Sequence, residues 1–148
     1  MLVQASEAVR LSGLTAHQLR EWCGRRALVE ADVPPAGRGH LALFSWQTIL
    51  ALRVLHEVHL RYAIEVSGWR EAIAQLQALL RKRAFPSLWG HAVMFSNARE
   101  ASLRVSSDPL RNCSCLVVEL DAHLEILATP NDLRVESQLP LFPAIAVR

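Results

Sequence analysis

The chain has 148 residues, of which 51% are hydrophobic and 20% charged, and its formal net charge at pH 7 is +2. This length and composition allow one good core or two small cores that share an interface, and apolar runs broken by His, Arg or Glu exclude a membrane span, so we expect no signal peptide and no membrane anchor. The odd count of three cysteines argues against a secreted disulfide framework and favours a reducing cytoplasm.

The first 25 residues predict two short helices joined by a tight turn. Ser6 is a candidate N-cap for a helix that runs to about Leu11, the Ser12–Leu14 tripeptide turns the chain, and Thr15 caps the second helix. This order is that of a helix-turn-helix, in which the second helix reads DNA. The residues expected to face inward are Leu14, Leu19 and Trp22.

The next segment predicts a β-hairpin with a projecting tip. Leu28–Val29 and Leu41–Phe44 are short apolar runs, and Pro34–Gly39 between them has the composition of a loop. Two strands around such a loop form a wing, and Arg38 and His40 are expected to lie on it.

Two more helices are expected before residue 84. Ser45 is a candidate cap for a helix with apolar residues at helical spacing from Ile49 to Leu60, and a second amphipathic helix runs from about Trp69 to Arg83. Pro86 ends the helical region. Beyond it, short β-branched or alternating runs predict strands at His91–Phe95, Ser102–Ser106, Cys115–Leu120, Leu124–Leu127 and Leu139–Val147.

We therefore predict an α+β fold with two domains. Residues 1–83 form a winged helix-turn-helix that binds DNA, and residues 87–148 form a small, mostly antiparallel β module for dimerisation or partner binding. The charge divides in the same way, because residues 1–83 carry 11 basic and 7 acidic side chains, a net +4, while residues 84–148 carry 5 and 7, a net −2. A basic excess on the motif favours nucleic acid as its partner.

Three segments resemble the MerR family of bacterial transcription regulators, over Ser6 to about Leu80. Glu7–Thr15 is similar to that family's opening helix and turn, Gln18–Trp22 to its Thr-Leu-Arg-Tyr-Tyr recognition-helix signature, and Leu43–Ser45 to the Arg-Tyr-Ser that closes its wing. The resemblance implies a winged helix-turn-helix that reads the major groove of double-stranded DNA with its second helix and holds the backbone with its wing.

The resemblance also implies DNA contacts at particular positions. Arg20 matches the arginine of the signature, and Arg38 lies in the wing. The remaining candidates are polar residues of the recognition helix and wing, namely Thr15, His17, Gln18, Arg25 and His40.

The chain departs from the family at three points. Glu21 stands where the family has an aromatic residue, and Arg26 stands where it usually has glycine. Members of the family dimerise through a long helix after the DNA-binding domain, whereas here the helical pattern stops near Arg83. We still expect a homodimer, since specific sites are commonly read by two copies at half-site spacing.

A second hypothesis makes the chain a protein-interaction factor, either antitoxin-like or an accessory protein that binds the sliding clamp, with an autoregulatory DNA-binding domain. Gln138–Phe142 looks like the short peptide with which bacterial replication and repair proteins grip the clamp. In such a peptide the contacts would come from Gln138, Leu139, Leu141 and Phe142. The same residues also fit a final β-strand.

No catalytic motif stands out, so we do not expect an enzyme. The chain has no Gly-rich phosphate loop, no nucleophile elbow and no paired-carboxylate setting. Cys113 and Cys115 supply two thiols, but zinc normally takes four ligands and no paired Cys or His elsewhere completes the set. We therefore expect no metal and no cofactor.

Overall fold

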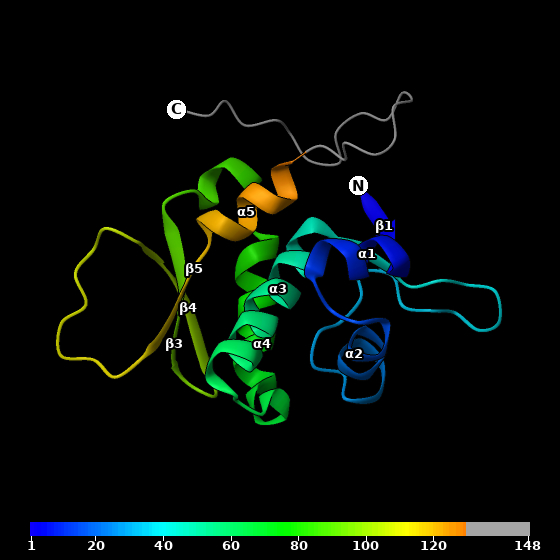
Figure 1. Ribbon diagram of the computed structural model, residues 1–148, viewed down its shortest axis with the longest axis horizontal. Helices are drawn as coiled ribbons and strands as arrows, with labels where there is room; N and C mark the ends of the chain where they lie inside the picture. The colour runs from blue at the N-terminus through cyan, green and yellow to red at the C-terminus, as the bar shows by residue number, and fades with distance from the viewer. Residues whose placement is uncertain (130–148) are drawn as a thin grey trace.

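The computed structural model describes residues 1–129, and it is a mixed structure of helices and two small antiparallel sheets (Figure 1). The α+β class is confirmed. The helices are α1 (Ala5–Ser12), α2 (Ala16–Arg20), α3 (Trp46–Tyr62), α4 (Arg70–Arg81) and α5 (Asp121–Ala128). The strands are β1 (Leu2–Gln4), β2 (Leu43–Ser45), β3 (His91–Asn97), β4 (Glu100–Val105) and β5 (Leu116–Glu119). A π-helical turn (Glu21–Arg25) continues α2, and 3₁₀ turns lie at Val66–Trp69 and Phe85–Leu88.

The first sheet joins the segment before α1 to the segment before α3. β1 pairs antiparallel with β2, with Val3 opposite Phe44, and an isolated antiparallel bridge joins Val33 to Leu43. The backbone N–H groups of Val33 and Leu43 donate to each other's carbonyls at 3.1 and 3.0 Å. The chain between these two residues therefore leaves and returns as a hairpin with a long loop.

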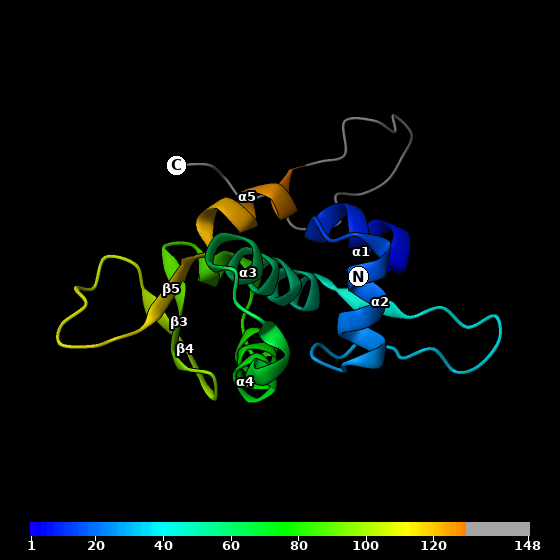
Figure 2. The ribbon, with the colours of Figure 1, turned by 60° about the horizontal axis from the view of Figure 1, so that its bottom comes forward.

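The second sheet has the strand order β4-β3-β5, and both pairings are antiparallel. β3 is the central strand, with Val93 opposite Leu103 on β4 and opposite Val118 on β5. The helix α4 packs against β4 and β3, and α3 and α4 lie between this sheet and the α1–α2 pair (Figures 1 and 2).

The helix α3 is the centre of the molecule because it packs against α1, α4, α5 and β5. Eight of its residues are buried, namely Thr48, Ile49, Leu50, Ala51, Leu52, Val54, Leu55 and Val58. The buried apolar side chains form one cluster that runs from Val3 to Leu127. The two halves of the described chain thus share one core, while the expected boundaries at 83 and 87 stay predictions.

The predicted helix caps are confirmed at the two positions that orient the first half. The Thr15 side chain accepts from the Gln18 backbone at 3.1 Å, and the Gln18 side chain accepts from the Thr15 backbone at 2.9 Å, which together form a capping box. Ser45 caps α3, because its Oγ accepts from the Thr48 N–H at 3.3 Å. Ser6 is not a cap, since α1 begins at Ala5 and its N-cap is Gln4.

Two strand predictions are wrong. Leu124–Leu127 belongs to α5, because a short apolar run fits a buried helix face as well as a strand. Leu28 and Val29 are buried but lie in no strand, and the hairpin closes at Val33 instead. The expected strand Leu139–Val147 lies outside the described residues. No helix within residues 1–129 is long and apolar enough to cross a membrane.

Candidate nucleic-acid interface

The α1–α2 pair is held at a fixed angle by the turn between its helices. Gly13 ends α1 with φ +80°, a conformation that side chains disfavour, and its N–H donates to the Val9 carbonyl at 3.1 Å. Ser12 is buried and its Oγ accepts from the Leu14 N–H at 3.3 Å. The turn is thus set by backbone and side-chain bonds, and α2 begins directly after Thr15.

The outer face of α2 carries most of the predicted contact residues. Leu19 and Trp22 are buried, whereas His17, Arg20 and Arg25 are exposed on the other faces of the helix. Thr15 is exposed and Gln18 half-buried, and the capping box already uses the side chains of both. His17 and Arg20 therefore have the freest side chains of the predicted set on this helix, since Arg25, in the turn that follows it, lies 3.4 Å from the Glu21 carboxylate.

The end of α2 widens into the π-helical turn Glu21–Arg25, a deviation that is frequent at functional sites. Gly24 lies in this turn, and a Cβ at this position meets no atom within 4 Å. Packing therefore does not require glycine there. The bare backbone is exposed, so another molecule can approach it closely.

Glu21, the residue that departs from the family pattern, is paired. Its carboxylate lies 3.4 Å from Arg25 and 3.8 Å from Arg26. Arg26 also donates to Glu65 at 2.8 Å and to Ser67 at 2.8 Å. This network ties the end of α2 to the connection between α3 and α4. The two arginines also offset the negative charge of the Glu21 carboxylate.

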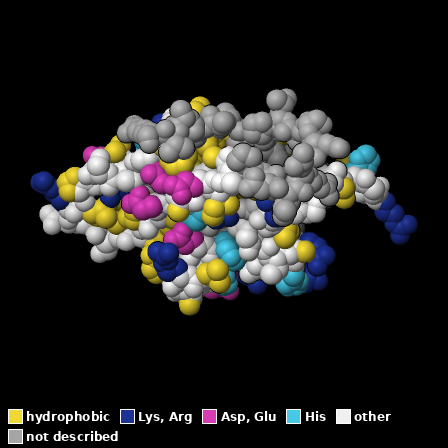
Figure 3. All heavy atoms as spheres, turned by 45° about the horizontal axis from the view of Figure 1, so that its top comes forward, with side chains coloured by type: hydrophobic (Ala, Val, Ile, Leu, Met, Phe, Trp, Pro, Cys, Tyr) yellow, Lys and Arg dark blue, Asp and Glu magenta, His cyan; other side chains and the backbone are white. Residues whose placement is uncertain are grey.

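The hairpin that closes at Val33 and Leu43 carries the other two candidates, and we call it the 33–43 hairpin. Arg38 and His40 are exposed on its loop, between or beside Gly37 and Gly39, which have φ values of +94° and +88°. The loop projects from one end of the molecule (Figures 1 and 2), and basic and His side chains gather at that end in Figure 3. The predicted loop with Arg38 and His40 on it is confirmed, although its first strand is only one bridge.

A carboxylate fixes the base of this hairpin. Asp32 accepts from the Ser45 N–H at 2.6 Å and from the Ser45 Oγ at 2.9 Å. Ser45 is also the cap of α3, so one acidic side chain joins the hairpin to the central helix. The position of the loop therefore depends on a few side-chain bonds.

A groove of about 830 Å³ separates α2 from the base of the 33–43 hairpin. Arg20 lines it from α2, Cys23 and Gly24 line it from the π-helical turn, and Pro34 and Pro35 line it from the hairpin. Arg81 at the end of α4 lines it as well. Neither Arg20 nor Arg38 forms an ion pair among residues 1–129. Sequence reasoning missed Arg81, because no local pattern brings the end of α4 to α2.

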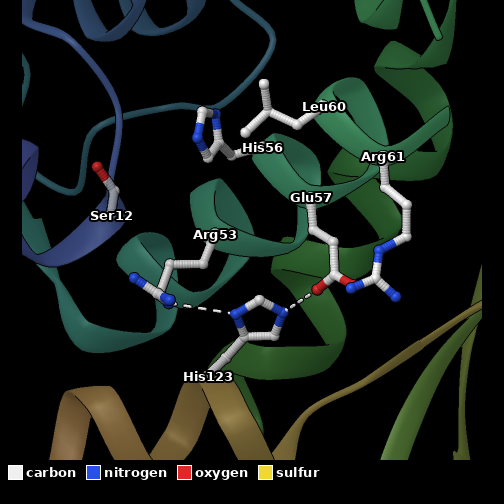
Figure 4. A pocket seen from close by; sticks show the side chains of 7 residues that line it. All are labelled: Ser12, Arg53, His56, Glu57, Leu60, Arg61 and His123. Atoms are coloured by element: carbon white, nitrogen blue, oxygen red, sulfur yellow. Dashed lines mark hydrogen bonds and ion pairs between the residues drawn. The ribbon is translucent and has the colours of Figure 1, made fainter. Parts of the chain in front are cut away.

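A second hollow, of about 360 Å³, lies where the two halves meet (Figure 4). Arg53 on α3 donates through Nη1 to the Leu11 carbonyl at 2.6 Å and through Nε to His123 Nδ1 at 3.2 Å. The other ring nitrogen of His123 lies 2.5 Å from Glu57. This chain of side chains ties α5 to both α3 and α1.

The bonds to His123 define its protonation. Because Nδ1 accepts from Arg53, the imidazole is neutral and its proton sits on Nε2, which donates to Glu57. Burial lowers the pKa of His123, and the nearby Arg53 charge lowers it further, against the opposing effect of Glu57. Burial also lowers the pKa of His56, which lines the same hollow. No local pattern predicts this cluster, since His123 is far along the chain from Arg53 and Glu57.

The described residues contain no group of three or more His, Cys, Asp or Glu side chains that could hold a metal ion. Gln138, Leu139, Leu141 and Phe142 lie outside the described residues. α3, with 17 residues, is the longest helix in residues 1–129, so no long dimerisation helix follows α4 in that range.

No family model matches the chain, and no curated protein is similar to it. The MerR resemblance therefore stays a hypothesis that rests on the three segments quoted above.

Proposed function

We propose that this chain is a sequence-specific DNA-binding transcription regulator whose N-terminal half works as a winged helix-turn-helix. The observation that carries the proposal is the groove lined by α2 on one side and by the base of the 33–43 hairpin on the other. In this proposal α2 enters the major groove and the hairpin loop lies along the phosphate backbone.

The charges of the described residues support this assignment. Arg20 and Arg38 are exposed and unpaired among residues 1–129, so both guanidinium groups are available to guanine or phosphate. The carboxylate of Glu21, which would repel phosphates, lies against Arg25 and Arg26. Gly24 leaves the exposed π-helical turn after α2 free of a side chain at that position.

Two copies are needed for the proposed reading of DNA. A single module of this size covers only a short DNA site. A two-fold dimer reads two such half-sites, one helical turn apart, in a palindrome. We therefore propose that the protein binds as a homodimer through its C-terminal half, in place of the family's long helix.

The test is a selection from genomic fragments, followed by binding to the enriched duplex at several salt concentrations. We expect a shared palindrome. Arg20→Ala is expected to cost about 1–3 kcal/mol on the selected site and to relax its sequence preference. Arg38→Ala is expected to weaken binding to all duplexes and to lower the salt slope by about 1.

The matched control is Arg111→Ala, because Arg111 is an exposed arginine on the β4–β5 loop. Its DNA affinity should equal that of the unchanged protein, and its mass in solution, measured in parallel, should show that the substitution leaves the oligomeric state as it is. Equal affinities for Arg20→Ala, Arg38→Ala and the control would overturn the proposal. Weak, salt-sensitive binding without a shared motif would instead favour the protein-interaction hypothesis.

A further inference from the structure

Two thiols face each other on the loop that joins β4 to β5. Cys113 and Cys115 are two residues apart, and their Sγ atoms are 3.6 Å apart. Cys113 is exposed and Cys115 is half-buried. The loop projects from the opposite end of the molecule to the 33–43 hairpin (Figures 1 and 2), so neither thiol belongs to the interface described above.

The two cysteines are anchored to different degrees. Cys115 directly precedes β5, which pairs with the central strand β3. Cys113 follows Asn112, whose φ of +50° turns the loop just before the first thiol. Further back the loop is tied to the sheet, since the Ser106 Oγ donates to Glu119 at 2.5 Å. One sulfur thus sits beside a strand and the other on an exposed bend.

The pair supplies too few ligands for a zinc site. Zinc in proteins takes four ligands, and the described residues offer no group of three or more metal-ligating side chains. A disulfide, by contrast, needs only two sulfurs, which approach to about 2.05 Å. The gap between 3.6 Å and a bond is small enough for side-chain rotation on an exposed loop to close.

We propose that Cys113 and Cys115 form a reversible dithiol–disulfide pair that is oxidised by a low-molecular-weight disulfide such as oxidised glutathione. The Cys113 thiolate attacks one sulfur of the oxidant, whose S–S bond breaks and releases one glutathione thiolate. Cys115 then loses its proton, and its sulfur attacks the Cys113 sulfur and displaces the second glutathione thiolate. Two protein thiols are oxidised, one disulfide is reduced, and the two protons pass to the glutathione thiolates.

The roles of the two cysteines follow from exposure and hydrogen bonding. Cys113 is the exposed sulfur and meets the oxidant first. The hydrogen bond with Cys113 raises the pKa of Cys115, so Cys115 keeps its proton until the mixed disulfide has formed. Attack on a disulfide requires the thiolate, which assigns the first step to Cys113 and the second to Cys115.

The third cysteine is an internal control. Cys23 lies at the end of α2, where burial raises its pKa to about 12. At neutral pH this thiol holds its proton and is a poor nucleophile. Loss of thiols on mild oxidation is therefore assigned to the β4–β5 loop.

The experiment equilibrates the reduced full chain in glutathione buffers that range from fully reduced to fully oxidised and stops the exchange with acid. The free thiols are then alkylated with a maleimide in denaturant at neutral pH, and the intact mass is measured. We expect the oxidised protein to lose two maleimide sites and two hydrogen atoms, without a glutathione adduct. Cys23→Ser should show the same loss. Cys115→Ser should accumulate a glutathione adduct at Cys113, and Cys113→Ser should react more slowly than the unchanged protein, because its remaining loop thiol, Cys115, is half-buried.

Three outcomes would overturn the proposal. The first is a chain that keeps all three maleimide sites in fully oxidised buffer. The second is a stable glutathione adduct on the unchanged protein, which would mean that Cys115 does not reach Cys113. The third is a disulfide between two chains, seen as a dimer on a non-reducing gel.

Discussion

The two halves of the molecule each project one long loop, at opposite ends, and the loops are held in different ways (Figures 1 and 2). The 33–43 hairpin closes with one isolated bridge and depends on Asp32, which binds Ser45. The β4–β5 loop joins two strands that both pair with β3 along several residues. One backbone bridge and one side chain therefore position the basic loop, whereas extended backbone pairing positions the loop with the thiols.

The first prediction tests whether the halves are independent. Phe95 on β3 is buried and its ring meets Trp69 edge-on at 5.4 Å. Phe95→Ala is expected to lower the free energy of unfolding by about 3–5 kcal/mol, because it leaves a cavity in a packed core. Since the core is one cluster, thermal unfolding should remain a single transition, and hydrogen exchange should accelerate in α1 as well as in β3. Protection retained in α1 while β3 opens would show two separate domains.

The second prediction compares the loops directly. Asp32→Ala removes the acceptor of both Ser45 bonds and is expected to cost about 2 kcal/mol, because a partly buried N–H loses its partner. The control is Asp108→Ala on the β4–β5 loop, where the backbone carbonyl, which the substitution keeps, accepts from Arg104. We expect the control to lie within about 0.5 kcal/mol of the unchanged protein in urea titrations. Equal effects of the two substitutions would contradict the comparison.

The third prediction concerns the junction between the halves. Burial lowers the pKa of His123 in the folded chain, so the unfolded chain binds a proton first as the pH falls through about 6.5. The free energy of unfolding should therefore be highest above this pH and decline toward pH 5.5. His123→Gln should flatten the decline, and His56 accounts for part of the remainder, because its pKa is lowered in the same direction. Urea titrations at pH 7.5 and 5.5 measure both slopes, and identical slopes would contradict the assignment.

Local chemistry made part of the fold predictable. Thr15 and Ser45 cap the helices that follow them, as expected, and Gly13 lies in the expected turn. Each acts within a few residues of its own position. The strand His91–Phe95 was found for a similar reason, since alternating and β-branched residues favour extended chain. The strand predicted at Leu124–Leu127 is wrong because a four-residue segment with three apolar residues fits either period.

The parts of the site that depend on long-range contacts were not predictable. The motif predicts Arg20 and Arg38 as contact residues, but Arg81 lines the groove beside Arg20 only through the packing of α4. Asp32 gives no local signal of its role, because its partner is Ser45 across the hairpin. The Arg53–His123–Glu57 chain joins residues far apart in sequence, and no periodicity encodes such a contact.

The smallest expected effect is that of a substitution at Gly24, which should change stability and DNA affinity in opposite directions. Gly24 lies in the turn Glu21–Arg25, and an added Cβ meets no atom within 4 Å. Gly24→Ala is expected to raise the free energy of unfolding by up to about 1 kcal/mol, since alanine loses less backbone entropy in a helix. If α2 lies in the major groove, the added methyl group stands between the helix and the duplex, so DNA affinity should fall while stability rises. Parallel urea titrations and duplex binding measure the two quantities. A fall in affinity despite higher stability cannot come from a structural effect, which would move both quantities in the same direction. Unchanged or higher affinity in the stabilised variant would instead place the turn Glu21–Arg25 away from the DNA.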